Sequence, residues 1–269
     1  MSTCISALQH IRKLRGGCQS QLLRASDGAY YVCKSLNNPQ HIRVLANEML
    51  ATRLGRLLGL PMPQVEIVDV SARLIEHSTD FRIDLAGSRI PCTPGKHFGS
   101  LYIEEPESSL VVDYLPDELL RAVSNIDDFA RVIVLDKWTC NADGRQAVFA
   151  RKKRGRKFSA HFIDQGYCFN AGEWSFPDFP LRGVYAKNCV YENVRGWDDF
   201  EPALTRAEYM DVNEIWQIAR GIPPEWYEFD TGGLHRLVET LYRRRSIIRD
   251  LIIQFRSSTR NPFPLWTSR

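Results

Sequence analysis

Four charged side chains in the first two thirds of the chain have the types and the order needed to handle a phosphate group. Lys34 ends a strand-like run, and Glu48 follows 14 residues later in a helical pattern. Asp143 lies in a stretch of turn residues, and Asp164 follows an apolar run. A lysine can neutralise phosphate oxygens, one carboxylate can accept a hydroxyl proton, and another can hold Mg²⁺. This set predicts transfer of a phosphoryl group.

Glu48 lies beside the apolar face of its predicted helix, with Val44, Leu45 and Ala51 at helical spacing. A carboxylate in that position needs a partner, and a strand lysine packed against the helix would supply one. In phosphotransferases such a pair holds the lysine against nucleotide phosphates. Considered one at a time, Lys34 and Glu48 are also compatible with ordinary surface charges.

The two aspartates each follow a regular element. Asp143 lies in the stretch Asp136-Lys137-Trp138-Thr139-Cys140-Asn141-Ala142-Asp143-Gly144-Arg145, which leaves a predicted helix and precedes a strand. Asp164 follows the apolar pair Phe162-Ile163 in the stretch Phe162-Ile163-Asp164-Gln165-Gly166, where the glycine two residues on allows a sharp change of direction. Both stretches are also compatible with plain turns.

The first third of the chain predicts a small unit of strands with one helix. Strands are expected at 19–25 and 29–35 around a Ser26-Asp27-Gly28 turn, followed by a helix from about 40 to 58 and a strand at 65–70. Residues 76–108 contain many turn residues and predict an irregular connector.

The remainder predicts helices and one hairpin. Helices are expected at 116–123, 127–139, 205–220 and 234–255, and the hairpin should pair about 146–152 with 158–164. Division into an N-terminal part with its connector, 1–112, and a C-terminal helical part, 113–269, follows from this pattern.

Composition excludes several classes. Net charge is only +3 in 269 residues, and no apolar run approaches the roughly 20 residues that span a membrane. The chain begins without a signal pattern, and its seven cysteines are odd in number and scattered. We therefore expect a cytoplasmic protein without a disulfide framework.

Taken together, the chain resembles the HipA-like kinase family, which is distantly similar to protein and phosphoinositide kinases. The resemblance covers most of residues 8–170 and rests on stretches with matching order and spacing: Gly16-Gly17-Cys18-Gln19-Ser20-Gln21, Tyr31-Val32-Cys33-Lys34, Asn37-Asn38-Pro39-Gln40, Asn47-Glu48, Leu58-Gly59-Leu60-Pro61-Met62-Pro63, the Trp-x-x-Asn-x-Asp stretch and Ile163-Asp164-Gln165-Gly166.

The resemblance implies an α+β, bilobal, protein-kinase-like fold that binds ATP and Mg²⁺. It implies that Asp143 is the catalytic aspartate, that Lys34 contacts the phosphates and that Glu48 pairs with Lys34. It further implies that Asp164 binds the metal and that the glycine-rich turn, with Gly17, Cys18, Gln19 and Ser20, covers the phosphates. The acceptor would be a hydroxyl, in relatives that of a protein serine or threonine.

One departure from the family pattern leaves an alternative open. Gly144 intervenes before Arg145, so the expected metal-binding asparagine falls on Gln146, Ala147 or Val148. Gln146 could offer an amide oxygen to the metal. A pseudokinase or nucleotide-binding interaction module with little or no catalysis is the alternative hypothesis.

Two basic stretches suggest a third hypothesis, nucleic-acid binding. Residues 152–157 lie at a predicted hairpin tip without interleaved aromatic residues, and Arg243, Arg244, Arg245 and Arg249 crowd the last helix. Solvated charges explain both stretches better, so the expected partners are ATP and an unknown protein or small-molecule acceptor, not a nucleic acid or a membrane.

Overall fold

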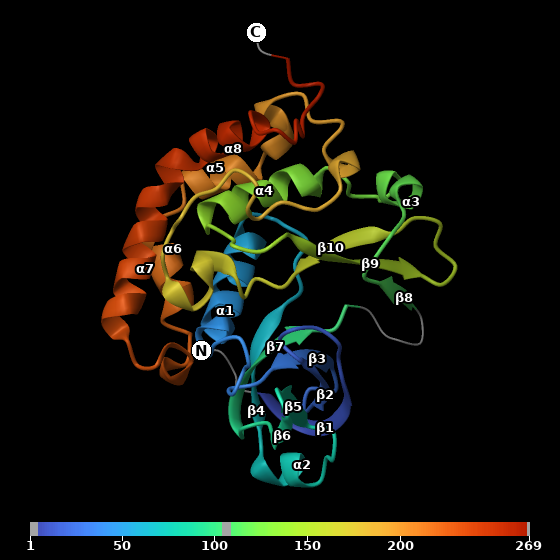
Figure 1. The fold of residues 1–269 in the computed structure, drawn as a ribbon, viewed down its shortest axis with the longest axis vertical. Coiled ribbons are helices and arrows are strands. Elements are labelled where there is room, and N and C mark those ends of the chain that lie inside the picture. Colours follow the sequence, from blue (N-terminus) through green and yellow to red (C-terminus); the bar gives the residue numbers. More distant parts are fainter. Residues whose placement is uncertain (1–4, 104–108, 268–269) are drawn as a thin grey trace.

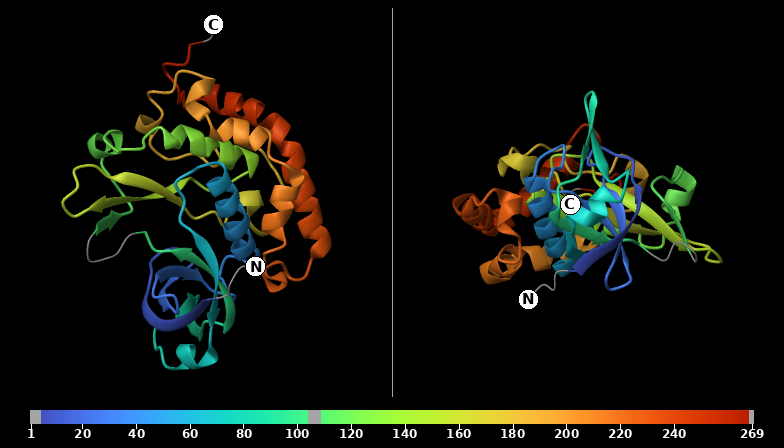
Figure 2. Two further views of the ribbon diagram at one scale, coloured as in Figure 1. Left: turned by 180° about the vertical axis from the view of Figure 1, so that it is seen from behind. Right: turned by 90° about the horizontal axis from the view of Figure 1, so that it is seen from below.

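The computed structural model describes residues 5–103 and 109–267 (Figure 1). It is a mixed α+β structure in which a β-barrel lies at one end and most helices lie at the other (Figures 1 and 2). Two separate hydrophobic cores correspond to this arrangement, one within the barrel and a larger one among the helices. No helix of the described residues is long and apolar enough to cross a bilayer.

Five strands close the barrel in the order β1-β2-β3-β7-β4. They are β1 (Ile5–Lys13), β2 (Gln21–Ala25), β3 (Tyr30–Lys34), β7 (Gly95–Leu101) and β4 (Val65–Val70). All neighbouring strands are antiparallel except β1 and β4, which pair in parallel through Ile5 opposite Val68. The predicted strands at 19–25, 29–35 and 65–70 are thus present, whereas sequence reasoning missed β1.

The prediction of an irregular connector over 76–108 is wrong over residues 76–103, and residues 104–108 lie outside the described ranges. This region contains the hairpin of β5 (Arg82–Leu85) and β6 (Ser88–Pro91), and it supplies β7, which pairs with both β3 and β4. The glycines that suggested a loop have a packing reason. A Cβ on Gly99 would lie 2.5 Å from Val68 Cγ2 in the neighbouring strand β4, so only glycine fits at this point of the β4–β7 pairing.

Helix α1 (Arg43–Leu57) joins the barrel to the helical part, because its buried residues belong to the larger core. Helix α4 (Asp128–Trp138) lies at the centre of that core, and Trp138 is fully buried. The predicted hairpin is confirmed as β9 (Gln146–Lys152) and β10 (Ser159–Ile163). Strand β8 (Ser109–Val112) adds to its edge, and the division of the chain after residue 112 stays a prediction.

The predicted helices over 205–220 and 234–255 are each interrupted. The first is α5 (Ala203–Glu208) and α6 (Val212–Ala219), because Asp211 caps α6 with Glu214 in a reciprocal capping box. The second is α7 (Thr231–Arg244) and α8 (Ile248–Arg256), with a short 3₁₀ turn between them.

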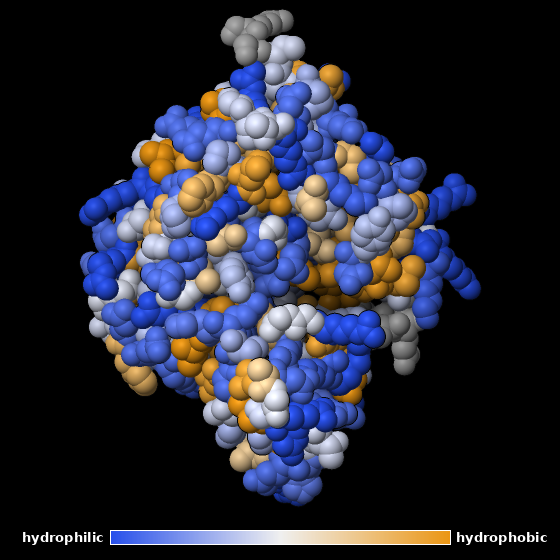
Figure 3. All heavy atoms as spheres, viewed as in Figure 1, coloured by the Kyte–Doolittle hydropathy of each residue, from blue (hydrophilic) through white to orange (hydrophobic). Residues whose placement is uncertain are grey.

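The smaller helices are α2 (Ala72–Glu76) and α3 (Asp117–Arg121). Helices α5 to α8 gather on the side of α1 and α4 that faces away from the β8–β9–β10 sheet (Figures 1 and 2). The space-filling view shows the surface hollowed between the barrel and this sheet, with apolar side chains along the hollow (Figure 3).

Candidate functional site

Lys34 is the centre of a buried ion-pair cluster built from three distant parts of the chain. It is the last residue of β3 and only 6% exposed. Its Nζ contacts Glu48 Oε1 of α1 directly and lies 2.8 Å from Asp164 Oδ1, just after β10. The predicted pairing of Lys34 with Glu48 is therefore present, and Asp164 is a second partner.

Glu48 also fixes the backbone that follows Asp164. Its Oε2 accepts the N–H of Gln165 at 3.0 Å, and its Oε1 accepts the N–H of Gly166 at 2.9 Å. A Cβ on Gly166 would lie 2.6 Å from Val44 Cγ1, so the glycine lets this segment approach α1 closely. One buried carboxylate thus holds both the strand lysine and the segment after β10.

Burial and charge act against each other at these three groups. Burial would lower the pKa of Lys34, but the carboxylates of Glu48 and Asp164 raise that pKa well above its usual value. Burial raises the pKa of Glu48, although Lys34 opposes the rise. Burial would also raise the pKa of Asp164, but Lys34 outweighs it and lowers that pKa. The Lys34 ammonium and the Asp164 carboxylate are therefore both charged at neutral pH.

Asp164 is the group in this cluster best suited to a metal ion. Its side chain remains 27% accessible, and its backbone adopts a left-handed conformation with φ of 61°. Within the described ranges, no group of three or more His, Cys, Asp or Glu side chains could hold a metal alone. Mg²⁺ commonly takes one or two carboxylates together with phosphate oxygens, so a single carboxylate beside a lysine that could contact those oxygens fits it.

Asp143 lies exposed in the loop between α4 and β9. The side-chain oxygen of Asn141 accepts the N–H of Asp143 at 3.1 Å, and the N–H of Gly183 donates to the Asp143 carbonyl at 3.0 Å. The Asp143 carboxylate accepts the N–H of Gly144 at 2.7 Å. The loop is thus fixed at its backbone, while the carboxylate faces solvent.

A buried ion pair that sequence reasoning missed joins this loop to the residues on either side of Asp164. The guanidinium of Arg145 pairs with Asp136, and both side chains are fully buried. Arg145 Nη1 also donates to the carbonyl of Ile163 at 2.9 Å and to Gln165 Oε1 at 2.6 Å. An arginine in a loop gave no signal of burial, but Asp136 at the apolar end of α4 did require a partner.

Gln146, the predicted metal ligand, is the first residue of β9 and is exposed. Its amide Nε2 lies 3.5 Å from Asp143 Oδ2, so the side chain reaches the predicted catalytic residue. Ala147 is buried and Val148 is half-buried. Of the three positions predicted for the missing asparagine, only Gln146 carries a side-chain oxygen.

The glycine-rich turn of residues 16–20 connects β1 and β2, and Cys18 within it is only 8% exposed. Burial raises the pKa of Cys18, and the charges of Lys34, Asp164 and Glu48 all act on this thiol. Cys18 is therefore near the ion-pair cluster, and its thiol donates to Gln40 Oε1. A Cβ on Gly17 would lie 3.0 Å from Gln40 Nε2, and the side chain of Ser20 is half-buried.

The side chain of Gln19 is committed elsewhere. Its Oε1 accepts from Lys13 Nζ at 2.6 Å and from the N–H of Asp84 at 2.7 Å, and its Nε2 donates to the Asp84 carbonyl at 2.6 Å. Its φ of 48° is left-handed. Gln19 would therefore contribute only its backbone to a phosphate, and its side chain fastens the turn to the β5–β6 hairpin.

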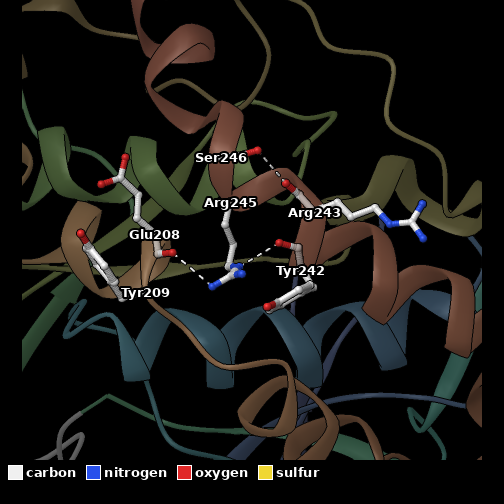
Figure 4. A pocket seen from close by; sticks show the side chains of 6 residues that line it. All are labelled: Glu208, Tyr209, Tyr242, Arg243, Arg245 and Ser246. Atoms are coloured by element: carbon white, nitrogen blue, oxygen red, sulfur yellow. Dashed lines mark hydrogen bonds between the residues drawn. The ribbon is translucent and has the colours of Figure 1, made fainter.

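The arginines of the last helices serve mainly as structural ties. Arg244 is buried and pairs with Asp178, while its Nε and Nη2 donate to carbonyls at the end of α4. A pocket of about 440 Å³ lies between α5 and α7 (Figure 4). There Arg245 donates to the carbonyls of Tyr242, Glu208 and Met210, so its guanidinium caps the end of α5.

Comparison with known proteins shows a likeness in fold to kinases of known structure. A solved structure of the Helicobacter pylori proinflammatory kinase CtkA is 14% identical, with a TM-score of 0.54, and the match covers 91% of this chain and 98% of CtkA. The Golgi casein kinase is 11% identical, with a TM-score of 0.50 and coverage of 96% and 74%. The same kinase with Mn and ADP bound is 10% identical, with the same TM-score and coverage. These likenesses establish a kinase fold.

No curated protein matches the chain. The family model described as HipA-like kinase matches residues 9–152, which is more than half of the chain. The matched region includes Lys34, Glu48 and Asp143 and ends before Asp164. On the strength of this match, together with the kinase fold, the chain belongs to the HipA-like kinase family.

Proposed function

We propose that this protein transfers the γ-phosphoryl group of ATP to a hydroxyl group, in a reaction that requires Mg²⁺. The observation that carries the proposal is the position of Lys34 Nζ between Glu48 and Asp164. A lysine held by a helix glutamate beside a metal-binding carboxylate is the arrangement that protein kinases need in place for phosphoryl transfer.

Each residue of the site has a distinct part in this reaction. Lys34 would neutralise the ATP phosphates, and Glu48 would keep its side chain directed toward them. Backbone N–H groups of residues 17–20 would donate to phosphate oxygens. Asp164 would hold Mg²⁺, with Gln146 as a further oxygen ligand. Bound Mg²⁺ supplies charge neutralisation at the phosphate oxygens.

Asp143 would act on the acceptor. Its exposed carboxylate would orient the acceptor hydroxyl and take its proton as the hydroxyl oxygen bonds to the γ-phosphorus. The bond between that phosphorus and the β–γ bridging oxygen breaks, and ADP leaves. We propose a serine or threonine of a protein as the acceptor, because an exposed Asp143 is accessible to a large substrate.

The loop around Gln146 supports a second candidate, a pseudokinase that binds nucleotide without catalysis. No asparagine occupies positions 144–148, and Gln146 approaches Asp143. If the longer glutamine side chain cannot place its oxygen at a second metal, transfer would be slow or absent although ATP still binds.

Two measurements separate these candidates. Calorimetry should show ATP binding that Mg²⁺ strengthens, and Asp164→Ala should remove this strengthening. Lys34→Met should weaken binding with and without Mg²⁺, whereas Lys153→Met, at an exposed lysine in the turn between β9 and β10, is the control and should change neither. Absence of wild-type binding at millimolar ATP would contradict both candidates.

Transfer is then followed with ATP labelled at the γ-phosphate and a protein mixture rich in serine and threonine. Asp143→Asn should reduce transfer by about 10²-fold or more while ATP affinity stays within about twofold. Wild-type protein that binds ATP and Mg²⁺ but transfers no label to itself, to the mixture or to water would identify the pseudokinase.

A further inference from the structure

Asn47 is fully buried beside Glu48 in α1 and binds four points on one segment. Its Nδ2 donates to the carbonyls of Gly166 at 2.8 Å, Cys168 at 3.1 Å and Ala171 at 2.8 Å. Its Oδ1 accepts from Trp174 Nε1 at 2.8 Å. An amide NH₂ has two protons, so the three carbonyls share them and no polar atom of Asn47 is left unused.

The segment that Asn47 binds has a backbone conformation that is unfavourable without contacts from the rest of the protein. Left-handed φ values occur at Phe169 (59°), Asn170 (56°), Ala171 (57°) and Trp174 (49°), as well as at Asp164 (61°). Each of these residues has a side chain, and a left-handed φ at a residue other than glycine raises the energy of the segment by about 1–3 kcal/mol. The conformation therefore persists only where surrounding contacts determine it.

Arg43, one helical turn before Asn47, holds the same segment from the same face of α1. Its Nη1 donates to the Gly172 carbonyl at 3.2 Å, and its guanidinium lies 4.7 Å from the ring centroid of Trp174. Its Nη2 also pairs with Asp230 at 3.1 Å. Helix α1 is therefore attached to residues 165–174 along two successive turns.

We propose that Asn47 is a positioning residue that sets the direction of the Asp164 carboxylate. It acts by fastening residues 166–174 to α1, next to the Glu48 contacts with Gln165 and Gly166. The role of Asp164 in metal binding rests on the proposed function, but the fastening itself does not. Helix α1 then determines the positions of both the Lys34 and the Asp164 side chains. Any partner or ligand that shifts this helix would therefore weaken phosphate binding and metal binding together.

The test compares Asn47→Ala with Asn188→Ala. Asn188 is a matched control, because it also binds backbone, the carbonyl of Arg260 at 3.0 Å, but it contacts no residue of the site. In Asn47→Ala the Kd for ATP with Mg²⁺ should rise about tenfold, which corresponds to about 1.4 kcal/mol. The Kd without Mg²⁺ should change by less than about twofold. Asn188→Ala should change neither constant.

Hydrogen exchange of the ATP-free protein gives a readout that does not depend on nucleotide. Amides of residues 165–174 should exchange at least about tenfold faster in Asn47→Ala than in wild type, and those of the barrel should not. Asn47→Asp should behave like Asn47→Ala, because it keeps the acceptor for Trp174 but loses both donors. Trp174→Phe removes only the indole N–H that donates to Asn47 Oδ1. Both N–H donors of Asn47 remain, so this variant should retain most of the Mg²⁺ effect on ATP binding.

Two results would overturn the proposal. One is a variant Asn47→Ala whose only change is lower global stability, with wild-type exchange over 165–174 and wild-type Mg²⁺ dependence. The other is loss of Mg²⁺ dependence in Asn188→Ala to the same degree. If wild type binds no ATP, the proposed function fails, while the exchange result still decides whether Asn47 fastens the segment.

Discussion

At the scale of single residues, the site is explained by which charges are buried and what surrounds them. Lys34 and Glu48 are 6% and 3% exposed, and removal of either would leave the other buried with fewer partners for its charge. Asp164 adds a second carboxylate, which gives the cluster one negative charge in excess of Lys34 when all three are ionised. In a nucleotide–metal complex, the metal ion would supply positive charge to the Asp164 carboxylate. The phosphates of the nucleotide would contact the Lys34 ammonium.

His97 is a second buried ionisable residue, and it predicts acid sensitivity of the barrel. Its Nε2 lies 2.7 Å from the Thr93 carbonyl, and its Nδ1 is buried without a hydrogen-bond partner. Burial lowers the pKa of His97 from 6.5 to about 4. The unfolded chain therefore takes up a proton between these values that the folded protein does not.

The stability contributed by neutral His97 should be present above pH 6.5 and lost as the pH falls toward 4. The loss amounts to about 3 kcal/mol at most. Urea unfolding at a series of pH values should show a shallower pH dependence in His97→Gln than in wild type. The exposed His235→Gln is the control, and an unchanged slope in His97→Gln would refute the prediction.

At the scale of elements, the glycine-rich turn depends on a hairpin that the sequence did not reveal. Three hydrogen bonds join Gln19 to Lys13 and to the backbone of Asp84 in β5. Lys13 Nζ also pairs with Asp84 Oδ2 at 2.7 Å. The β5–β6 hairpin thus holds the turn that is proposed to cover the phosphates.

Gln19→Ala should loosen this turn and weaken ATP binding severalfold, because the three side-chain bonds are lost. Gln19→Gly loses the same bonds but accepts the left-handed φ, so it should be more stable than Gln19→Ala by about 1 kcal/mol. Calorimetry with ATP and urea unfolding measure the two effects. Equal stability of the two variants would show that φ at this position carries no strain.

Elements with a strong local pattern could be predicted, and those that depend on distant contacts could not. The hairpin at 146–163 and the helix at 128–138 follow from alternation, turn residues and a continuous apolar run. Strand β7 was missed because its glycines and lysine resemble a loop. The reason for Gly99 is Val68 of the neighbouring strand β4, more than 30 residues earlier in the chain. The pairing of Lys34 with Glu48 could be predicted because a carboxylate beside an apolar helix face needs a partner.

The roles of Asn47 and Arg145 could not be predicted in the same way. Asn47 was visible only as part of a family resemblance, and its four partners lie more than 100 residues away in the chain. Arg145 stands in a loop, where charged residues are normally solvated, yet it is 3% exposed. Local sequence contains no signal for a side chain whose partners come from another segment.

At the scale of the whole molecule, a segment of the C-terminal region ties the helices to the barrel. Trp226 is fully buried, its Nε1 donates to the Lys96 carbonyl of β7 at 2.8 Å, and its ring lies 6.5 Å from that of Phe98. The Nζ of Lys96 also lies 3.6 Å from Glu225 Oε1. Glu225 and Trp226, which belong to no catalytic motif, thereby help to fix the barrel relative to α1. Because Lys34 is part of the barrel, its position is fixed as well.

Trp226→Ala should lower the free energy of unfolding by about 3–5 kcal/mol. Because the barrel has its own hydrophobic core, the variant should also unfold in two steps, which fluorescence and far-UV circular dichroism would resolve as non-coincident curves. The half-buried Trp216→Ala should cause a smaller loss and keep one transition. A single transition in Trp226→Ala would show that other contacts suffice for coupling.

The closure of the barrel has a consequence for how the protein behaves when it is damaged. Since β1 and β4 meet, each of the five barrel strands has a neighbour on both sides. A row of unpaired backbone amides is what recruits other chains into aggregates. The β1–β4 pairing is short, with Ile5 opposite Val68 and Ser6 opposite Asp69. If heat or a mutation displaced the helices, the exposed barrel would therefore present apolar surface but little unpaired strand, and we expect its self-association to be amorphous and reversible in preference to fibrillar.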